Sequence, residues 1–254
     1  MAGQLGIIGS ATSPDSSTQS SSQSTDKADG GHSSNGSGTD NANGTGGVGG
    51  TDGADGDNQD TVTDNPLKIV ESGWSADQQG YVHYAFALRN TSKTQQVQYP
   101  QITITGRAKD GSIVFSQTQA LNMAFPNQTV YDAGQAGEGT APETVDFTVL
   151  NPDTYNVAKA QGTAAFPISG ISKIDNRDGG TTFNGEVRAV ADGFKPSDGQ
   201  QIKISLVLRN AQNAIIYGDI AFVDWPGNGR STPFSITVYD LPKYVSYDLY
   251  AQIW

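Results

Sequence analysis

Cysteine is absent from the 254 residues of this chain. Its absence excludes disulfide bonds, thiolate metal sites and a cysteine nucleophile. Histidine is limited to His32 and His83, and glutamate occurs only four times. No apolar run approaches the length of a transmembrane helix, so we expect no insertion of this chain into a membrane. With so few catalytic side chains, the composition argues against an enzyme, and it indicates neither a cofactor nor a metal site.

Phe, Trp and Tyr are missing from residues 1–64, which consist mainly of Gly, Ser, Thr, Asp and Asn. Such a segment buries too little apolar surface to offset its ordering entropy, so we expect it to be disordered. It contains nine Asp and one Lys, a net charge of −8, and because the whole chain carries −11, the rest carries −3. Basic clusters are lacking, which excludes nucleic acid as a partner and disfavours an anionic membrane surface.

The remaining residues show the alternating pattern of β-strands. Val82, Tyr84 and Phe86 fall on one face of the clearest strand, residues 81–88, and His83 falls on the other. Asp110-Gly111 predicts a hairpin. Further strands are expected at residues 101–105, 112–117, 144–150, 155–160, 168–174, 182–190, 201–209, 214–222, 233–239 and 245–254. Helical periodicity is absent, so the fold class is all-β: two tandem immunoglobulin-like antiparallel β-sandwich domains preceded by a disordered tail.

An internal repeat supports this division, because residues 82–150 are echoed by residues 183–239. Residues 102–115 match residues 204–217, and the alternating strand 145–149 matches 234–238. A repeat of this length is a domain with its own core. We therefore predict an acidic Gly/Ser/Asp-rich tether at 1–64, a first sandwich at 65–163 and a second at 164–254.

A strand ending in Phe86-Ala87-Leu88-Arg89-Asn90 is followed by an alternating strand with Ile102 and Ile104 and by the Asp110-Gly111 turn. Residues 204–210, 214–217 and 232–234 repeat most of this pattern. It resembles the FxLYD-type domains of exported bacterial proteins. The resemblance implies an immunoglobulin-like sandwich, found in lipoproteins or membrane-tethered surface proteins of Gram-positive bacteria, and it supplies no catalytic residues. The resemblance implies an extracellular or cell-surface location. The cysteine that carries the lipid in lipoproteins is absent, so we expect the anchor to lie in a segment outside this chain.

Two features suggest metal or catalytic chemistry but have simpler interpretations. His83 would need partners that the sequence cannot locate to form a metal site or a Ser-His-Asp triad, so we interpret it as a surface or interdomain histidine. The Asp-rich residues 52–60 resemble a calcium loop, but Asp60 and Pro66 stand where that loop needs Gly and Glu. A solvated linker is the better interpretation.

A surface sandwich without cysteine could be crosslinked by a Lys–Asn isopeptide bond. Lys68 and Lys203 lie within strands, but alternation puts both on the face opposite their apolar neighbours. We therefore expect both lysines to be solvated and uncrosslinked.

The C-terminal strand provides the candidate ligand-binding surface. Tyr244, Tyr250 and Trp254 are expected on its outer face, where aromatic rings can stack on sugars or anchor a protein. The alternative is that they pack at the edge of the sandwich or at the junction between the domains. The inward face is expected to hold Val245, Tyr247, Leu249, Ala251 and Ile253.

The predicted function is a non-enzymatic exported or cell-surface module that acts in display, spacing or ligand binding. The first alternative is a binding module for an envelope or host glycan or protein, through the C-terminal aromatics. A hydrolase is disfavoured, although paired Asp residues could meet in space. The sequence does not identify the partner, for which a cell-envelope component and another protein are both candidates.

Overall fold

The computed structural model describes residues 65–254, which fall within one compact unit. The predicted tail, its Asp-rich run and His32 lie outside the described residues. In the described part, no helix has the length and apolar character that a membrane crossing requires.

The first sandwich consists of two three-stranded antiparallel sheets, with strand orders β1-β2-β7 and β5-β4-β8, and a small sheet of order β6-β3-β9. Ile102 and Ile104 alternate with polar residues along β4, so they enter the core with Tyr84 and Phe86 from β2. The elements are β1 (Leu67–Ala76), β2 (Val82–Asn90), β3 (Gln95–Gln98), β4 (Gln101–Arg107), β5 (Ile113–Ala120), β6 (Met123–Ala124), β7 (Thr129–Ala136), β8 (Thr144–Val149), the 3-10 helix η1 (Thr154–Asn156) and β9 (Val157–Lys159).

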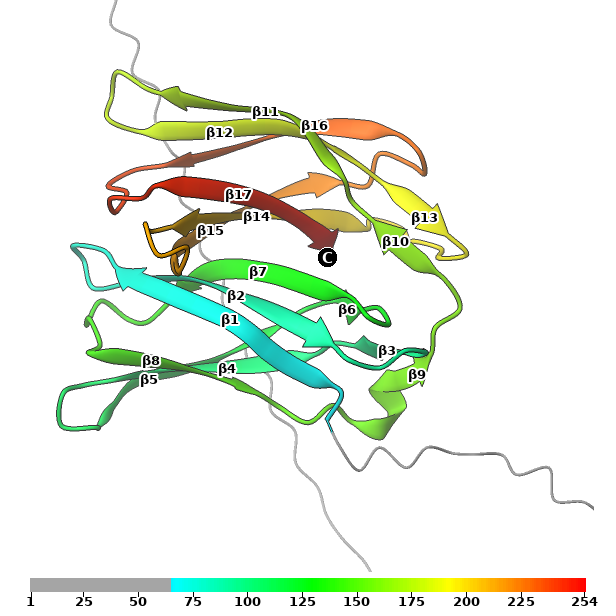
Figure 1. The fold of residues 1–254 in the computed structure, drawn as a ribbon, viewed down its shortest axis with the longest axis horizontal. Coiled ribbons are helices and arrows are strands. Elements are labelled where there is room, and N and C mark those ends of the chain that lie inside the picture. The colour runs from blue at the N-terminus through cyan, green and yellow to red at the C-terminus, as the bar shows by residue number, and fades with distance from the viewer. Residues whose placement is uncertain (1–64) are drawn as a thin grey trace, which may run out of the picture. The chain divides into compact units, whose positions relative to one another are not determined.

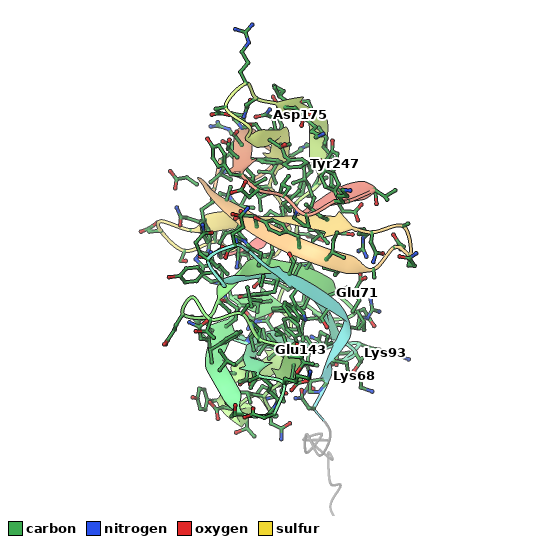
Figure 2. All side chains as sticks on the ribbon, turned by 90° about the vertical axis from the view of Figure 1, so that its left-hand side faces the viewer. Lys68, Glu71, Lys93, Glu143, Asp175 and Tyr247 are labelled. Atoms are coloured by element: carbon green, nitrogen blue, oxygen red, sulfur yellow. The ribbon has the colours of Figure 1, made fainter. Side chains whose placement is uncertain are left out.

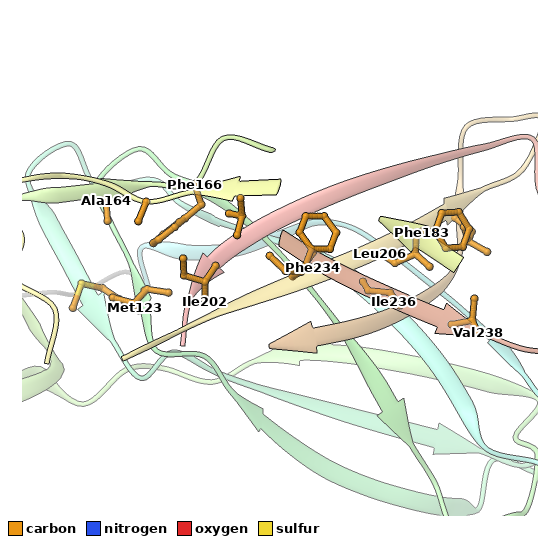
Figure 3. Close-up of a cluster of buried hydrophobic side chains, with 14 of the residues drawn as sticks. Met123, Ala164, Phe166, Phe183, Ile202, Leu206, Phe234, Ile236 and Val238 are labelled. Carbon is orange, nitrogen blue, oxygen red and sulfur yellow. The ribbon is translucent and has the colours of Figure 1, made fainter. Parts of the chain in front are cut away.

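The second sandwich repeats the two main sheets, with orders β11-β12-β16 and β15-β14-β17, and adds a β10-β13 pair. Figure 3 shows its core, in which Phe183, Leu206 and Ile236 pack together. Its strands are β10 (Thr163–Ala165), β11 (Ile168–Asp175), β12 (Thr181–Arg188), β13 (Val190–Asp192), β14 (Gln201–Arg209), β15 (Ile215–Asp224), β16 (Ser231–Val238) and β17 (Ser246–Ile253).

The all-β sandwich prediction is confirmed, and so is the Asp110-Gly111 hairpin, which joins β4 to β5 with Gly111 at a φ of 85°. One part of the repeat alignment is wrong. Residues 145–149 form β8, which pairs with β4, whereas residues 234–238 lie in β16, which pairs with β12. The strand orders make β17 the counterpart of β8 and β7 the counterpart of β16, because an alternating pattern does not specify which neighbour a strand pairs with.

The two sandwiches pack face to face (Figure 1). The sheet β1-β2-β7 of the first lies against the sheet β15-β14-β17 of the second, so four layers are stacked. Ala85, Ala133, Val207 and Ile215 form a small third core between the inner two layers. Both faces of these inner sheets are therefore covered.

The structure differs from the predicted elements in several places. The expected ranges omit β1, β3, β6, β7 and β10, although Lys68 of β1 was expected within a strand, and residues 155–160 begin within the 3-10 helix η1 before the short strand β9. The predicted boundary between residues 163 and 164 falls inside β10. Met123 and Phe125, which come from the first half of the chain, join the core of the second sandwich.

Candidate functional site

Two glycines, on the edge strands β1 and β15, allow the backbones of the two sandwiches to meet closely. A Cβ atom on Gly73 of β1 would lie 1.8 Å from the carbonyl oxygen of Ile215, and one on Gly218 of β15 would lie 2.2 Å from that of Tyr84. Only glycine allows the two backbones to approach so closely. The sequence at these positions therefore fits this face-to-face contact.

Arg209 of β14 forms the first polar contact across the interface. Its Nη1 and Nη2 atoms donate to the Glu71 carboxylate at 2.8 and 3.0 Å, and its Nε donates to Asp248 at 2.8 Å. Figure 2 labels Glu71 where β1 meets the second sandwich. The hydrogen bond from Arg209 lowers the pKa of Glu71, although partial burial opposes the shift. This bidentate pair fixes the relative orientation of the two sheets.

Tyr250, one of the three predicted ligand-binding aromatics, lies beside this ion pair. Its ring stacks on Tyr131 of the first sandwich at a centroid distance of 3.7 Å and an interplanar angle of 7°. The Tyr131 hydroxyl donates to Glu71 at 2.5 Å. One face of the Tyr250 ring is therefore occupied by the partner sandwich, as the junction alternative predicts.

The other two predicted aromatics lie elsewhere. Tyr244 precedes β17 and packs against Phe183 in the second sandwich. Trp254 follows β17 and lines a hollow of about 240 Å³ together with Tyr99 and Leu121 of the first sandwich. The three aromatics do not form one surface. Val245, expected in the core, is 71% exposed, because β17 begins only at Ser246.

Lys203 contradicts the prediction of a solvated lysine, whereas Lys68 is exposed as expected. Alternation does place Lys203 opposite the core of its own sandwich, but the first sandwich covers that face. Its side chain is 2% exposed, and its Nζ lies 2.7 Å from Oδ1 of Asp132 on β7, a fully buried carboxylate. Gln252 of β17 donates to the same oxygen at 2.6 Å, and the Trp254 ring covers the ammonium at 4.6 Å.

A crevice of about 400 Å³ opens at another part of the interface. It is lined from the first sandwich by Asp77, His83 and Gln135, and from the second by Tyr217 and Asp219. The interdomain interpretation of His83 is confirmed, since its ring stacks on Tyr217 at 4.6 Å. The crevice therefore requires both sandwiches.

The lining of the crevice is polar and includes the carboxylates of Asp77, Asp219 and Asp240. Asp77 is held in place by the backbone N–H groups of Gln79 and Tyr81 at 2.9 Å each, and its Oδ2 lies 3.4 Å from Nε2 of His83. Burial raises the pKa of the Asp219 carboxyl, while a backbone hydrogen bond from Ile220 opposes the shift. The carboxylates can accept hydrogen bonds from a hydroxyl-rich ligand, and the imidazole beside them can donate one.

Ser75 also lines this crevice, opposite His83 in the β1–β2 ladder. A Ser-His-Asp triad needs a hydrogen bond between nucleophile and base. The hydrogen bonds of residues 65–254 join His83 to Asp77 and Gln135 but not to Ser75. Within the same range, no cluster of three or more His, Asp or Glu has the arrangement of a metal site.

Asp132, Glu71 and Arg209 were missed as functional candidates from the sequence. One signal was available: Ala85 and Ala87 stand on the face of β2 opposite the core, so both faces of that strand are apolar. A strand that is apolar on both faces is covered on both. The pattern indicates a second layer, but it does not identify the strand or the charges that supply it.

No family model and no curated protein matches this chain. Among solved structures, a match is the exo-chitosanase CsxA of Amycolatopsis orientalis, with a TM-score of 0.20 and 11% identity over 69% of this chain. The chain spans 24% of the length of that structure. A TM-score this low supports no inference about fold or function.

Proposed function

We propose that this chain is a non-enzymatic exported or cell-surface module, in which the two sandwiches act together as one rigid unit for display or spacing. The location rests on the resemblance to FxLYD-type domains and on the tether-like composition of residues 1–64. The observation that supports the rigid unit is the interface. Its backbones are in close contact at Gly73 and Gly218, and it contains two ion pairs that join the sandwiches.

Rigidity matters for this role because a flexible pair of domains would not hold whatever it displays at a fixed distance or angle. Domains in one chain move relative to each other by default unless their interface is large and apolar or otherwise locked. Here the interface contains an apolar cluster and two ion pairs that join the sandwiches.

Spin labels test the rigid unit, and the absence of cysteine makes labelling simple. Cysteines introduced at exposed Ile113 in the first sandwich and Ile174 in the second would carry the labels. We expect one narrow distance distribution by pulsed electron spin resonance. A broad distribution would overturn the rigid-unit proposal.

Protease treatment of intact cells of the source organism tests the location. We expect the protein to be cleaved before lysis, whereas a cytoplasmic control protein stays intact. Protection of the protein until lysis would overturn the surface assignment.

A second candidate function is the binding of a hydroxyl-rich ligand, such as an envelope or host glycan. The observation that favours it is the crevice lined by Asp77, His83 and Asp219, which both sandwiches build. Ligand sites are often found at the boundary between domains.

A glycan array probed with the full chain tests this candidate. We expect retention that is lost in Asp219→Asn and kept in Asp146→Asn, a matched substitution on β8 of the first sandwich. Loss in Trp254→Ala with retention in Asp219→Asn would contradict the crevice and place binding at the C-terminal aromatics. Retention of no glycan by the unmodified chain would contradict both sites.

A further inference from the structure

The buried Lys203–Asp132 pair brings a primary amine and a carboxyl group together in the interface. Nζ lies 2.7 Å from Oδ1, and the side chains are 2% and 0% exposed. Asp132 stands opposite Phe86, a core residue, in the β2–β7 ladder, and Lys203 belongs to β14 of the other sandwich. The pair therefore joins two segments that are distant in the sequence.

As an ion pair this arrangement is incompletely satisfied. Oδ2 of Asp132 is buried without a hydrogen-bond partner among residues 65–254, and so are Oε1 of Gln252 and Oγ of Ser205. A buried ion pair is stable only when further hydrogen bonds satisfy its remaining lone pairs. The carboxylate lacks those bonds on one of its two oxygens.

Burial also favours the uncharged form of the Asp132 carboxyl. Transfer of a proton from the ammonium to the carboxylate gives a neutral amine and a carboxylic acid, which cost far less to keep away from water than two ions. Desolvation raises the pKa of Asp132, although Lys203 and the hydrogen bonds around the carboxylate oppose the shift. The neutral amine and the acid are the forms that can react with each other.

We propose that Lys203 and Asp132 condense to an amide that links the two sandwiches covalently. The ammonium first gives one proton to the carboxylate. The Nζ lone pair then forms a bond to Cγ, the bond from Cγ to Oδ2 breaks, and Oδ2 leaves as water with that proton and a second one from nitrogen. One N–H remains on the amide, the net charge stays zero, and no other reactant is consumed.

The neighbouring groups suit this reaction. Gln252 donates to Oδ1 at 2.6 Å, so its amide stabilises the negative charge that develops on this oxygen in the tetrahedral intermediate. The Trp254 ring lies over Nζ at 4.6 Å, and the pair is closed to solvent, so little water is available for the reverse reaction. Fixed proximity replaces a bimolecular encounter, which is the largest advantage of an intramolecular reaction.

The product also removes the unsatisfied atom. The oxygen without a partner is the one that leaves, and the two buried charges become a neutral amide. The crosslink closes a loop between residues 132 and 203, so it constrains the unfolded chain as a disulfide does, in a protein without cysteine.

Intact mass spectrometry of the denatured full chain tests the proposal without any variant. We expect a mass that is lower than the sequence mass by one water molecule. A proteolytic digest should contain a branched peptide that joins the segment around Asp132 to the segment around Lys203. The full sequence mass in protein that is folded by circular dichroism, with both linear peptides recovered, would overturn the proposal and leave an ion pair.

Two variants assign the bond. Lys203→Arg keeps the positive charge but has no primary amine, so it should show the full sequence mass. Lys68→Arg is the matched change at an exposed lysine, and it should keep the loss of one water. Loss of water that persists in Lys203→Arg, or a branched peptide at another lysine, would contradict the assignment.

Discussion

Two ion pairs cross the same interface, and they differ in their exposure to water. Lys203 and Asp132 are buried at 2% and 0% exposure, whereas Arg209 is 6% exposed but its partner Glu71 is 32% exposed. The Arg209 pair is bidentate and is supported by Asp248 and Tyr131, while Asp132 has an oxygen without a partner. The partly exposed Arg209–Glu71 pair, called the wet pair below, resembles an ordinary contact that orients two surfaces. The buried Lys203–Asp132 pair, called the dry pair below, has a high desolvation cost that needs a separate explanation.

Removing one member of the dry pair should have the largest effect on stability. Asp132→Ala leaves Lys203 buried without a counter-charge, and we expect the free energy of unfolding to fall by about 3–5 kcal/mol. Urea denaturation followed by Trp fluorescence measures the change. The double variant Asp132→Leu/Lys203→Met should recover the part that is due to the unpaired charge, and the remaining deficit measures the covalent link. A change below about 1 kcal/mol in Asp132→Ala would contradict the importance of the dry pair.

The second largest effect on stability is expected where the backbones of the two sandwiches approach each other closely. In Gly218→Ala, the new methyl group would lie 2.2 Å from the Tyr84 carbonyl oxygen, so the two sheets must separate. We expect a loss of about 1–3 kcal/mol, typical of overpacking. Gly111→Ala cannot serve as the control, because an alanine is strained at the φ of 85° found there. Ala85→Gly is the control, because it removes a methyl group from the same interface without a clash. Equal stability of Gly218→Ala and the unmodified chain would contradict the packed interface.

A smaller effect is expected for the wet pair. Glu71→Gln keeps the shape of the side chain but removes its charge, and partial exposure limits the loss to about 1 kcal/mol or less. High salt should reduce the difference between Glu71→Gln and the unmodified chain, because ions screen the exposed carboxylate. The dry pair should show no such salt dependence, and a salt effect of similar size at both pairs would contradict the comparison.

The smallest effect is the pH dependence of the wet pair. Arg209 lowers the pKa of Glu71, so the contribution of this carboxylate is fully present above its ordinary pKa of 4.5 and is lost as the pH falls through the folded-state pKa. The difference in unfolding free energy between the unmodified chain and Glu71→Gln isolates Glu71. We expect that difference to be constant near neutral pH and to shrink below about pH 4.5, where a pH-independent difference would contradict the ion pair.

Much of the fold was predictable from local pattern. The alternation in β4, β8 and β14 and the Asp110-Gly111 turn predicted strands and a hairpin that the structure contains. β7 was not predicted, because Asp132 and Gly134 interrupt its apolar alternation. Those residues are tolerated there because Asp132 meets Lys203 and because a side chain at position 134 would collide with Tyr84.

The candidate sites were less predictable. His83 could be interpreted as interdomain, but its neighbours come from two distant segments of the chain: Asp77 follows β1, and Tyr217 and Asp219 lie on β15. Tyr244, Tyr250 and Trp254 look equivalent in the sequence because even numbers of positions separate them, which places them on one face of an extended chain. They differ in the structure because the strand begins after Tyr244 and the first sandwich covers Tyr250.

The sequence by itself determined the strands, the turns, the all-β class and the absence of cysteine chemistry, because each depends on residue type and on periodicities of a few residues. Only the tertiary structure decided that the sandwiches meet face to face. That contact converts Lys203 from an outward-facing strand residue into a buried amine beside Asp132, 71 positions earlier in the chain. Alternation indicates which face of a strand points away from its own core, but whether water or another sheet covers that face depends on contacts between distant segments.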